Sequence, residues 1–129
     1  MKAQLLNVTV LVNDYDEAIK FYTDKLKFKL VEDTVLSEFK RWVLISPPGE
    51  SGTRLLLAKA VNEEQRSRIG NQTGGRVFLF LQTDNFTEYF DHLKKVGVTI
   101  VREPIVEPYG KVAVFSDLYG NLSDLIEPR

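Results

Sequence analysis

The chain has 129 residues, of which 43% are hydrophobic and 27% charged, and its formal net charge is −1. This length suits one compact domain, and the mixture of positive and negative residues disfavours a nucleic-acid or membrane partner. There is no cysteine and no apolar run long enough to span a membrane, and we expect no signal peptide. We therefore expect a cytoplasmic protein without disulfides, thiolate metal sites or a cysteine nucleophile.

The first half of the chain predicts a strand, a helix and three further strands. Asp14 followed by Glu17 resembles a capping box at a helix start, and apolar residues behind it recur at helical spacing. The segment 47–49, Pro-Pro-Gly, ends a strand. The four strands are expected at residues 5–12, 28–35, 40–46 and 53–59.

The second half repeats this order. A helix is expected to open at Asp84, to carry Phe86, Tyr89, Phe90 and Leu93 on its apolar face, and to end at Gly97. The four strands are expected at residues 76–82, 98–103, 111–116 and 121–127.

Residues 60–75 lie between the two halves. Their first part, 62–68, is typical of a polar helical turn, and Gly70, Gly74 and Gly75 follow it. These glycines could cradle a phosphate, but their spacing matches no phosphate-binding loop and no Lys-Ser/Thr pair follows. The segment is better interpreted as a flexible linker.

A shift of seventy positions superimposes the chain on itself. Leu11 falls on Leu81 and Asp14 on Asp84, and the apolar positions coincide without an insertion. A unit this small cannot bury a core alone, so the copies must pack on each other. The prediction is an α+β fold with two tandem βαβββ modules, about 1–59 and 71–129, which form an eight-stranded cupped sheet within a single domain, 1–129.

The two faces of each first strand differ. Alternation along a strand sends every second residue to the helix and the others to the opposite face, where two curved sheets would form a cup suited to a ligand. The residues expected toward the helices are Val8, Val10 and Val12 in the first unit and Phe78 and Phe80 in the second.

Three motifs carry a resemblance to a known family. They are Val10-Leu11-Val12-Asn13-Asp14, the segment 18–28 with Phe21-Tyr22 and Leu26-Lys27-Phe28, and the closing stretch 109–125. Together they resemble the vicinal-oxygen-chelate superfamily, which includes glyoxalase I, extradiol dioxygenases and the bleomycin resistance proteins. The resemblance covers the whole chain and implies the fold, but not one reaction.

In the metalloenzymes of that superfamily, His or Glu from the first and last strands of each unit hold a divalent ion in the cup. The matching positions here are Asn7, Arg54, Val77 and Asp124, which the seventy-residue shift also pairs. Valine offers no lone pair, arginine repels a metal, and only Asp124 is a good ligand. The single histidine, His92, is expected on the second helix, so we expect no metal and no other cofactor.

We expect Arg54 and Asp124 to form an ion pair across the cup, at the place of the metal. The pair would either orient an anionic or carbonyl-bearing ligand or serve only to join the two units. Arg54 would also lower the pKa of Asp124, which disfavours general-base catalysis by that carboxylate.

Three aromatic residues, Phe39, Trp42 and Tyr109, are the other ligand-binding candidates. Phe39 and Tyr109 are partners under the seventy-residue shift and stand at the entry to the third strand of each unit. They could stack over a ligand, or form edge packing or a dimer contact instead. Trp42 could line the cup or lie on the core face.

The sequence thus favours a metal-free module that binds a small organic molecule through Asn7, Phe39, Trp42, Arg54, Val77, Tyr109 and Asp124. The alternative is a lyase, isomerase or dioxygenase-like enzyme that uses a divalent metal with non-standard ligands. A third hypothesis is a protein with no small-molecule role. A homodimer is expected under each hypothesis.

Overall fold

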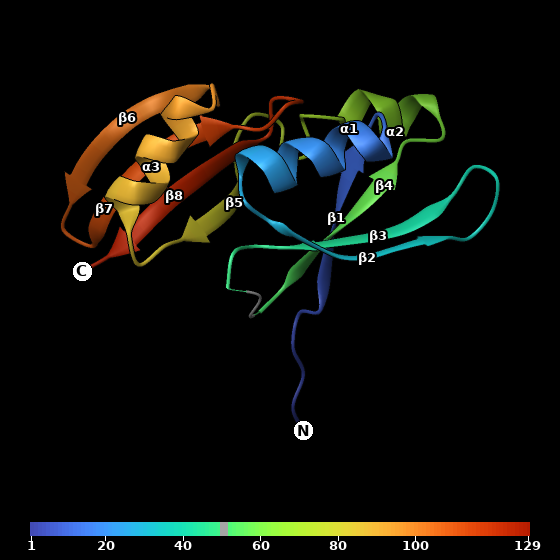
Figure 1. Cartoon of the computed structure of the whole chain (residues 1–129), viewed down its shortest axis with the longest axis horizontal. Coiled ribbons are helices and arrows are strands. Elements are labelled where there is room, and N and C mark those ends of the chain that lie inside the picture. Colours follow the sequence, from blue (N-terminus) through green and yellow to red (C-terminus); the bar gives the residue numbers. More distant parts are fainter. Residues whose placement is uncertain (50–51) are drawn as a thin grey trace. The chain divides into compact units, whose positions relative to one another are not determined.

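The computed structural model describes residues 1–49 and 52–129, and the chain divides into two compact units, Met1–Ile69 and Gly70–Arg129 (Figure 1). Each unit is a βαβββ module, which confirms the predicted order of elements. The described strands form two four-stranded sheets instead of the one eight-stranded sheet that was expected. The reason is that β1 pairs with β4 and β5 with β8, so each ladder of hydrogen bonds stays within its own unit.

In the first unit, the sheet order is β1-β4-β3-β2, with β1 parallel to β4 and the other pairs antiparallel. The helix α1 crosses one face of this sheet (Figure 1) and contributes buried Tyr15 and Ala18 to the core. Its elements are β1 (Asn7–Val12), α1 (Tyr15–Lys20), η1 (Phe21–Lys25), β2 (Lys29–Val35), β3 (Arg41–Ser46), β4 (Arg54–Lys59) and α2 (Glu63–Arg68).

The start of α1 follows the predicted capping pattern. The Asp14 carboxylate accepts a hydrogen bond from the Glu17 backbone N–H at 2.8 Å, which satisfies a helix-end donor. The α2 helix begins in the same way at Asn62, which accepts from the Gln65 N–H. It confirms the polar helical turn expected within residues 62–68.

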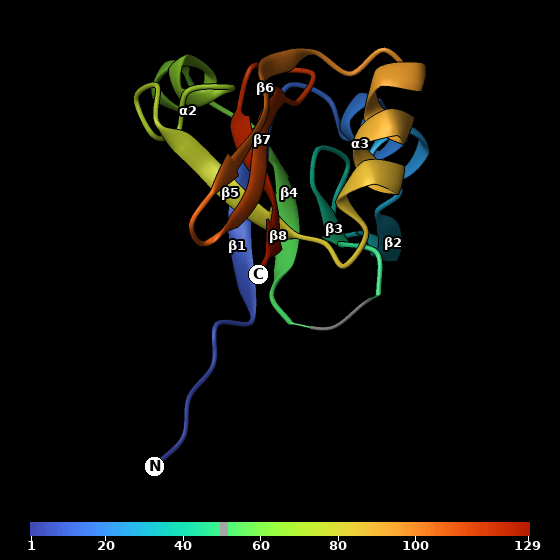
Figure 2. The same ribbon diagram turned by 90° about the vertical axis from the view of Figure 1, so that its left-hand side faces the viewer.

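In the second unit, the sheet order is β5-β8-β7-β6, again with the first pair parallel. The helix α3 lies against β8, and the Glu127 carboxylate of β8 accepts a hydrogen bond from the Phe86 N–H at the helix start. Figure 2 shows this unit from a second side. Its elements are β5 (Val77–Gln82), α3 (Phe86–Lys95), β6 (Ile100–Glu107), β7 (Gly110–Ser116) and β8 (Leu122–Pro128).

The repeat does contain insertions, contrary to the expectation of an uninterrupted seventy-residue shift. A β-bulge at Phe78 adds one residue to β5, and α3 therefore begins after Asn85 rather than at Asp84. The first unit has its own additional residue in η1, a π-helical turn in which the Leu26 N–H donates a hydrogen bond to the Phe21 carbonyl. The shift is seventy-one between these two features and seventy again after them.

A second offset lies before the last strand. Residues 47–53 separate β3 from β4, whereas residues 117–121, two fewer, separate β7 from β8. Sheet register shows the result, because Arg54 pairs with Asn7 while the counterpart of Asn7, Val77, pairs with Leu122. Arg54 therefore corresponds to Leu122, and the two residues expected to be repeat partners, Arg54 and Asp124, are not.

The bulge also changes which face one aromatic residue occupies. Val10 and Val12 are fully buried, as predicted for the helix-facing side of β1. Phe80, expected to face the helix of its unit, is instead 71% exposed. It pairs with Asp124, whereas the buried residues Ser123 and Leu125 pair with Leu79 and Leu81, so the inserted residue has reversed the alternation.

None of the helices in the described residues combines the length and the apolar character that crossing a membrane requires.

Candidate functional site

The first unit contains a pocket of about 340 Å³ where two of its strands diverge. The pairing of β3 with β4 joins Val43–Ile45 to Leu55–Leu57, and Trp42 and Ala58 lie just beyond its end. The pocket lies at this end of the pair. Its lining residues are Thr9, Tyr15, Phe39, Lys40, Arg41, Trp42, Leu56, Leu57, Ala58, Lys59, Val61 and Gln65.

Two of the predicted binding residues meet in this pocket. Phe39, in the turn between β2 and β3, is 78% exposed, and Trp42 of β3 is half-buried. Trp42 alternates with the fully buried Val43 along β3, so its side chain is not part of the core face. Trp42 therefore lines the pocket, and its part in ligand binding stays a prediction.

A second pocket of about 250 Å³ adjoins the first, since five residues line both. The five shared residues are Tyr15, Phe39, Lys40, Arg41 and Lys59. Asp14, Val35, Ser37 and Glu38 complete the second pocket. A ligand larger than the first pocket could therefore extend along the β2–β3 turn.

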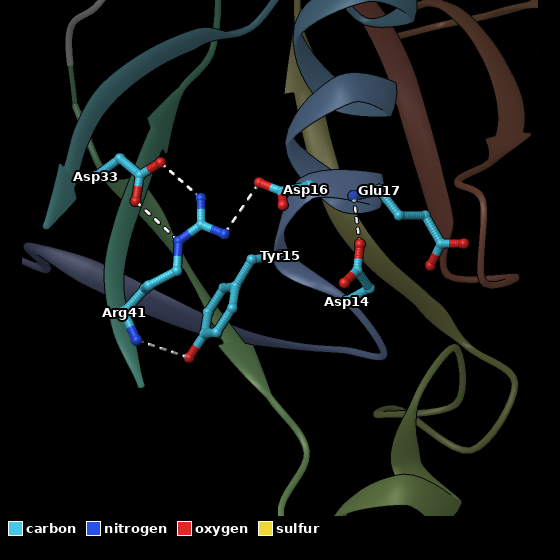
Figure 3. Close-up of polar contacts among 6 residues, drawn as sticks. All are labelled: Asp14, Tyr15, Asp16, Glu17, Asp33 and Arg41. Carbon is cyan, nitrogen blue, oxygen red and sulfur yellow. Dashed lines mark hydrogen bonds and ion pairs between the residues drawn. The ribbon is translucent and has the colours of Figure 1, made fainter. Parts of the chain in front are cut away.

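Arg41 joins α1 to the strands that form the pocket wall (Figure 3). Its guanidinium donates to both carboxylate oxygens of Asp33, at 3.1 and 2.7 Å, and to Asp16 at 2.9 Å. Its backbone N–H donates to the Tyr15 hydroxyl at 3.3 Å, and its guanidinium carbon lies 5.1 Å from the centre of the Tyr15 ring. The hydrogen bond with Asp33 is the main cause of a raised pKa at Arg41. These contacts fix Tyr15 at the pocket.

Asn7 and Arg54 lie side by side in the first unit, as register partners on β1 and β4. Both are half-buried, and the Asn7 Oδ1 atom is buried without a hydrogen-bond partner among the described residues. Neither residue lines the two pockets above. Their part in ligand binding stays a prediction.

Val77, Tyr109 and Asp124 belong to the second unit. Val77 pairs with Leu122, and Tyr109, 57% exposed, occupies the turn between β6 and β7 as Phe39 occupies that between β2 and β3. The ion pair of Asp124 with Arg54 would connect the two units and stays a prediction.

The pKa of Asp124 is raised, opposite to the expected direction. Burial of the carboxyl group is the main cause, and the positive charge of Arg102 opposes it in part. The expected argument against Asp124 as a general base, which depended on a lowered pKa, therefore does not hold.

The residues at the metal positions of the superfamily do not fit a metal ion. No group of three or more His, Cys, Asp or Glu side chains that could hold one is present among residues 1–49 and 52–129. By register, the counterpart of Asp124 in the first unit is Leu56, which has no donor atom. Leu56 lies two residues after Arg54, the partner of Asn7, and Asp124 lies two residues after Leu122, the partner of Val77. Asn7 offers only a weak neutral oxygen.

Sequence reasoning missed several pocket residues: Tyr15, Lys40, Arg41, Lys59 and Gln65. Tyr15 reaches Arg41 across 26 positions of sequence, a contact that no local pattern indicates. The run Phe39-Lys40-Arg41-Trp42, two cations between two aromatics, was the one available signal.

Comparison with known proteins places this chain in a family. The model of the Glyoxalase/Bleomycin resistance protein/Dioxygenase superfamily matches residues 4–125, and the chain belongs to that superfamily. An uncharacterized protein of Shewanella frigidimarina (strain NCIMB 400) is 55% identical over 128 residues, covering 98% of this chain and 95% of the relative.

Two solved structures are also similar. UcmS2 has 33% identity, a TM-score of 0.84 and 98% coverage of both chains. TnmS3, an antibiotic binding protein from Streptomyces sp. CB03234, has 27% identity and a TM-score of 0.80, covering 99% of this chain and 98% of its own.

Proposed function

We propose that this protein binds a small organic molecule with a planar aromatic surface in the first-unit pocket, without a metal ion. The observation that carries this proposal is the pocket itself, in which Trp42, Phe39 and Tyr15 line a volume of about 340 Å³. That volume falls within the roughly 300–1,000 Å³ usual for small-molecule sites, and aromatic side chains dominate such sites.

The similarity to TnmS3 supports a binding role over a catalytic one. TnmS3 is an antibiotic binding protein, and its fold matches almost the whole of this chain. The donor set described above lacks the ligands that the metalloenzymes of the superfamily require. Binding by stacking and apolar contact does not need a metal.

The test is the affinity of an uncharged fluorescent aromatic probe, N-phenyl-1-naphthylamine, for the wild type and for pocket variants. Phe39→Ala and Trp42→Leu should each weaken binding about fivefold or more, because each removes a stacking surface worth about 1 kcal/mol or more. Leu36→Ala is the matched control, since Leu36 is 54% exposed in the same turn but lines neither pocket. Equal affinity in all four proteins would reject this pocket as the site.

Two further expectations are part of the proposal, a second copy of the chain as partner and a cytoplasmic location. Exposed apolar side chains along β6, namely Val101, Ile105 and Val106, support the first of these. Sedimentation at several protein concentrations tests it, and a sedimentation coefficient of the monomer at every concentration would contradict it.

A further inference from the structure

The charges that line the 340 Å³ pocket all have one sign. Its charged residues are Lys40, Arg41 and Lys59, and its other lining residues are neutral. This contrasts with the chain as a whole, whose formal net charge is −1. The positive lining is therefore local to the pocket.

The three cations are not equally available to a ligand. Arg41 is held by Asp33 and Asp16, which line neither pocket and neutralise its charge. The side chains of Lys40 and Lys59 are exposed and make no ion pair or hydrogen bond with any described residue. Two unpaired ammonium groups therefore remain.

Those two lysines come from different elements and meet at the same place. Lys40 precedes β3, and Lys59 ends β4, so each lies next to the point where the strands diverge. Both also line the adjoining pocket of about 250 Å³, which Asp14 and Glu38 line as well. A ligand beside Phe39 and Trp42 would thus share the pocket with two cations.

We propose that the ligand of this pocket is an aromatic acid, whose carboxylate, sulfonate or similar anionic group is recognised by Lys40 and Lys59. This inference rests on the proposed function and adds the charge of the ligand to it. An ammonium group is a point charge with three rotatable donors, so it accepts anions of different shape. Recognition would therefore select the charge rather than one particular acid.

The experiment compares two probes that share one skeleton. 8-Anilinonaphthalene-1-sulfonate carries an anionic group that N-phenyl-1-naphthylamine lacks, so the ratio of their Kd values isolates the charge. We expect Lys40→Gln combined with Lys59→Gln to weaken binding of the sulfonate about tenfold, as two exposed ion pairs of about threefold each would. Binding of the uncharged probe should change by less than about twofold.

Lys2→Gln is the matched control, because Lys2 is exposed, precedes β1 and lines neither pocket. It removes one positive charge outside the pocket and should leave both Kd values unchanged. Added salt should weaken binding of the sulfonate to the wild type and leave the uncharged probe unaffected.

The outcomes separate this inference from the proposed function. The first outcome is sulfonate binding that the two lysine substitutions do not change, while binding of the uncharged probe still depends on Phe39 and Trp42. This result would overturn the anionic ligand but would leave the proposed binding function of the pocket standing. If the lysine variant binds both probes equally more weakly, the lysines have a structural role, and this result also overturns the anionic ligand. Failure of both probes to bind the wild type overturns the proposed function together with the inference.

Discussion

Arg41 and Asp33 form a two-pronged ion pair between neighbouring strands, with N–O distances of 3.1 and 2.7 Å. The side chains retain 23% and 29% of their exposure, so the pair is partly shielded from water. Because Arg41 also contacts Tyr15 and Asp16 on α1, this one residue joins the helix to the sheet beside the pocket.

Asp33→Asn should destabilise the fold by about 1–2 kcal/mol, because it removes the charge from a pair of charge-assisted hydrogen bonds. Asp16→Asn, the matched control, should cost less than about 1 kcal/mol, since the Asp16 side chain is 79% exposed and water screens its charge. Urea unfolding of the three proteins measures the difference. Equal losses would show that the two-pronged geometry adds nothing.

Gly70→Ala should destabilise the second unit strongly. Gly70 has a φ of +73°, and a Cβ atom there would collide with the backbone carbonyl of Tyr119. Gly74→Ala is the control, since Gly74 has a φ of +68° and a Cβ atom added to it would meet no other atom within 4 Å. The control should cost about 1 kcal/mol for backbone conformation alone.

The collision should add about 1–3 kcal/mol to the cost of Gly70→Ala, as overpacking does elsewhere. Thermal unfolding of the two variants in parallel gives the difference. Similar melting temperatures would show that the Tyr119 segment moves aside freely.

Asp124→Asn should change the pH dependence of stability. Since the pKa of Asp124 is raised in the folded state, the folded protein binds this proton more tightly than the unfolded chain does. Wild-type stability therefore falls as the pH rises from the ordinary value of 3.8 through the raised pKa. Asparagine has no proton to lose, so the variant should gain stability relative to the wild type over that range.

Melting temperatures between about pH 4 and about pH 7 measure this effect for the Asp124→Asn variant. Asp91→Asn, at an exposed position of α3, is the control substitution in the same unit. A difference between Asp124→Asn and the wild type that stays constant with pH would contradict the raised pKa.

Arg102→Gln should raise the pKa of Asp124 further, because the positive charge of Arg102 lowers it at present. NMR titration of the Asp124 carboxyl carbon measures the shift. The same titration of Arg54→Gln tests the predicted ion pair between Arg54 and Asp124. A pKa unchanged by that substitution would exclude the pair.

Chelation should not affect ligand binding. Treatment with EDTA should leave the Kd of N-phenyl-1-naphthylamine within about twofold of its starting value, since apolar and stacking contacts require no metal. Stoichiometric nickel, zinc or iron in protein purified without chelator would favour the metalloenzyme alternative.

The order of elements could be predicted from sequence because its signals are local. Asp14 and Glu17 lie within one helical turn, and the alternation of Val10 and Val12 lies within one strand. The interruptions of the repeat gave no such signal. The bulge at Phe78 adds one residue to the second unit, and the π-helical turn that ends at Lys25 adds one residue to the first. The two insertions therefore cancel when the halves of the sequence are compared.

The candidate site was predicted only in part, for a related reason. Phe39 and Trp42 were found because aromatic residues near a strand entry suggest a binding surface. The pocket, however, depends on where β3 parts from β4, and Tyr15 enters it through a contact with Arg41 far along the chain. Arg54 and Asp124 do not occupy equivalent positions of the repeat, because the loop before β8 is two residues shorter than the loop before β4.

The position of Trp42 gives the protein an optical signal of its own. It is the single tryptophan of the chain, and it lines the pocket. Indole emission depends on the polarity around the ring, so occupancy of the pocket should shift the spectrum of the unlabelled wild type. Natural extracts and compound collections can therefore be searched for the ligand without a dye, a tag or an assumed reaction.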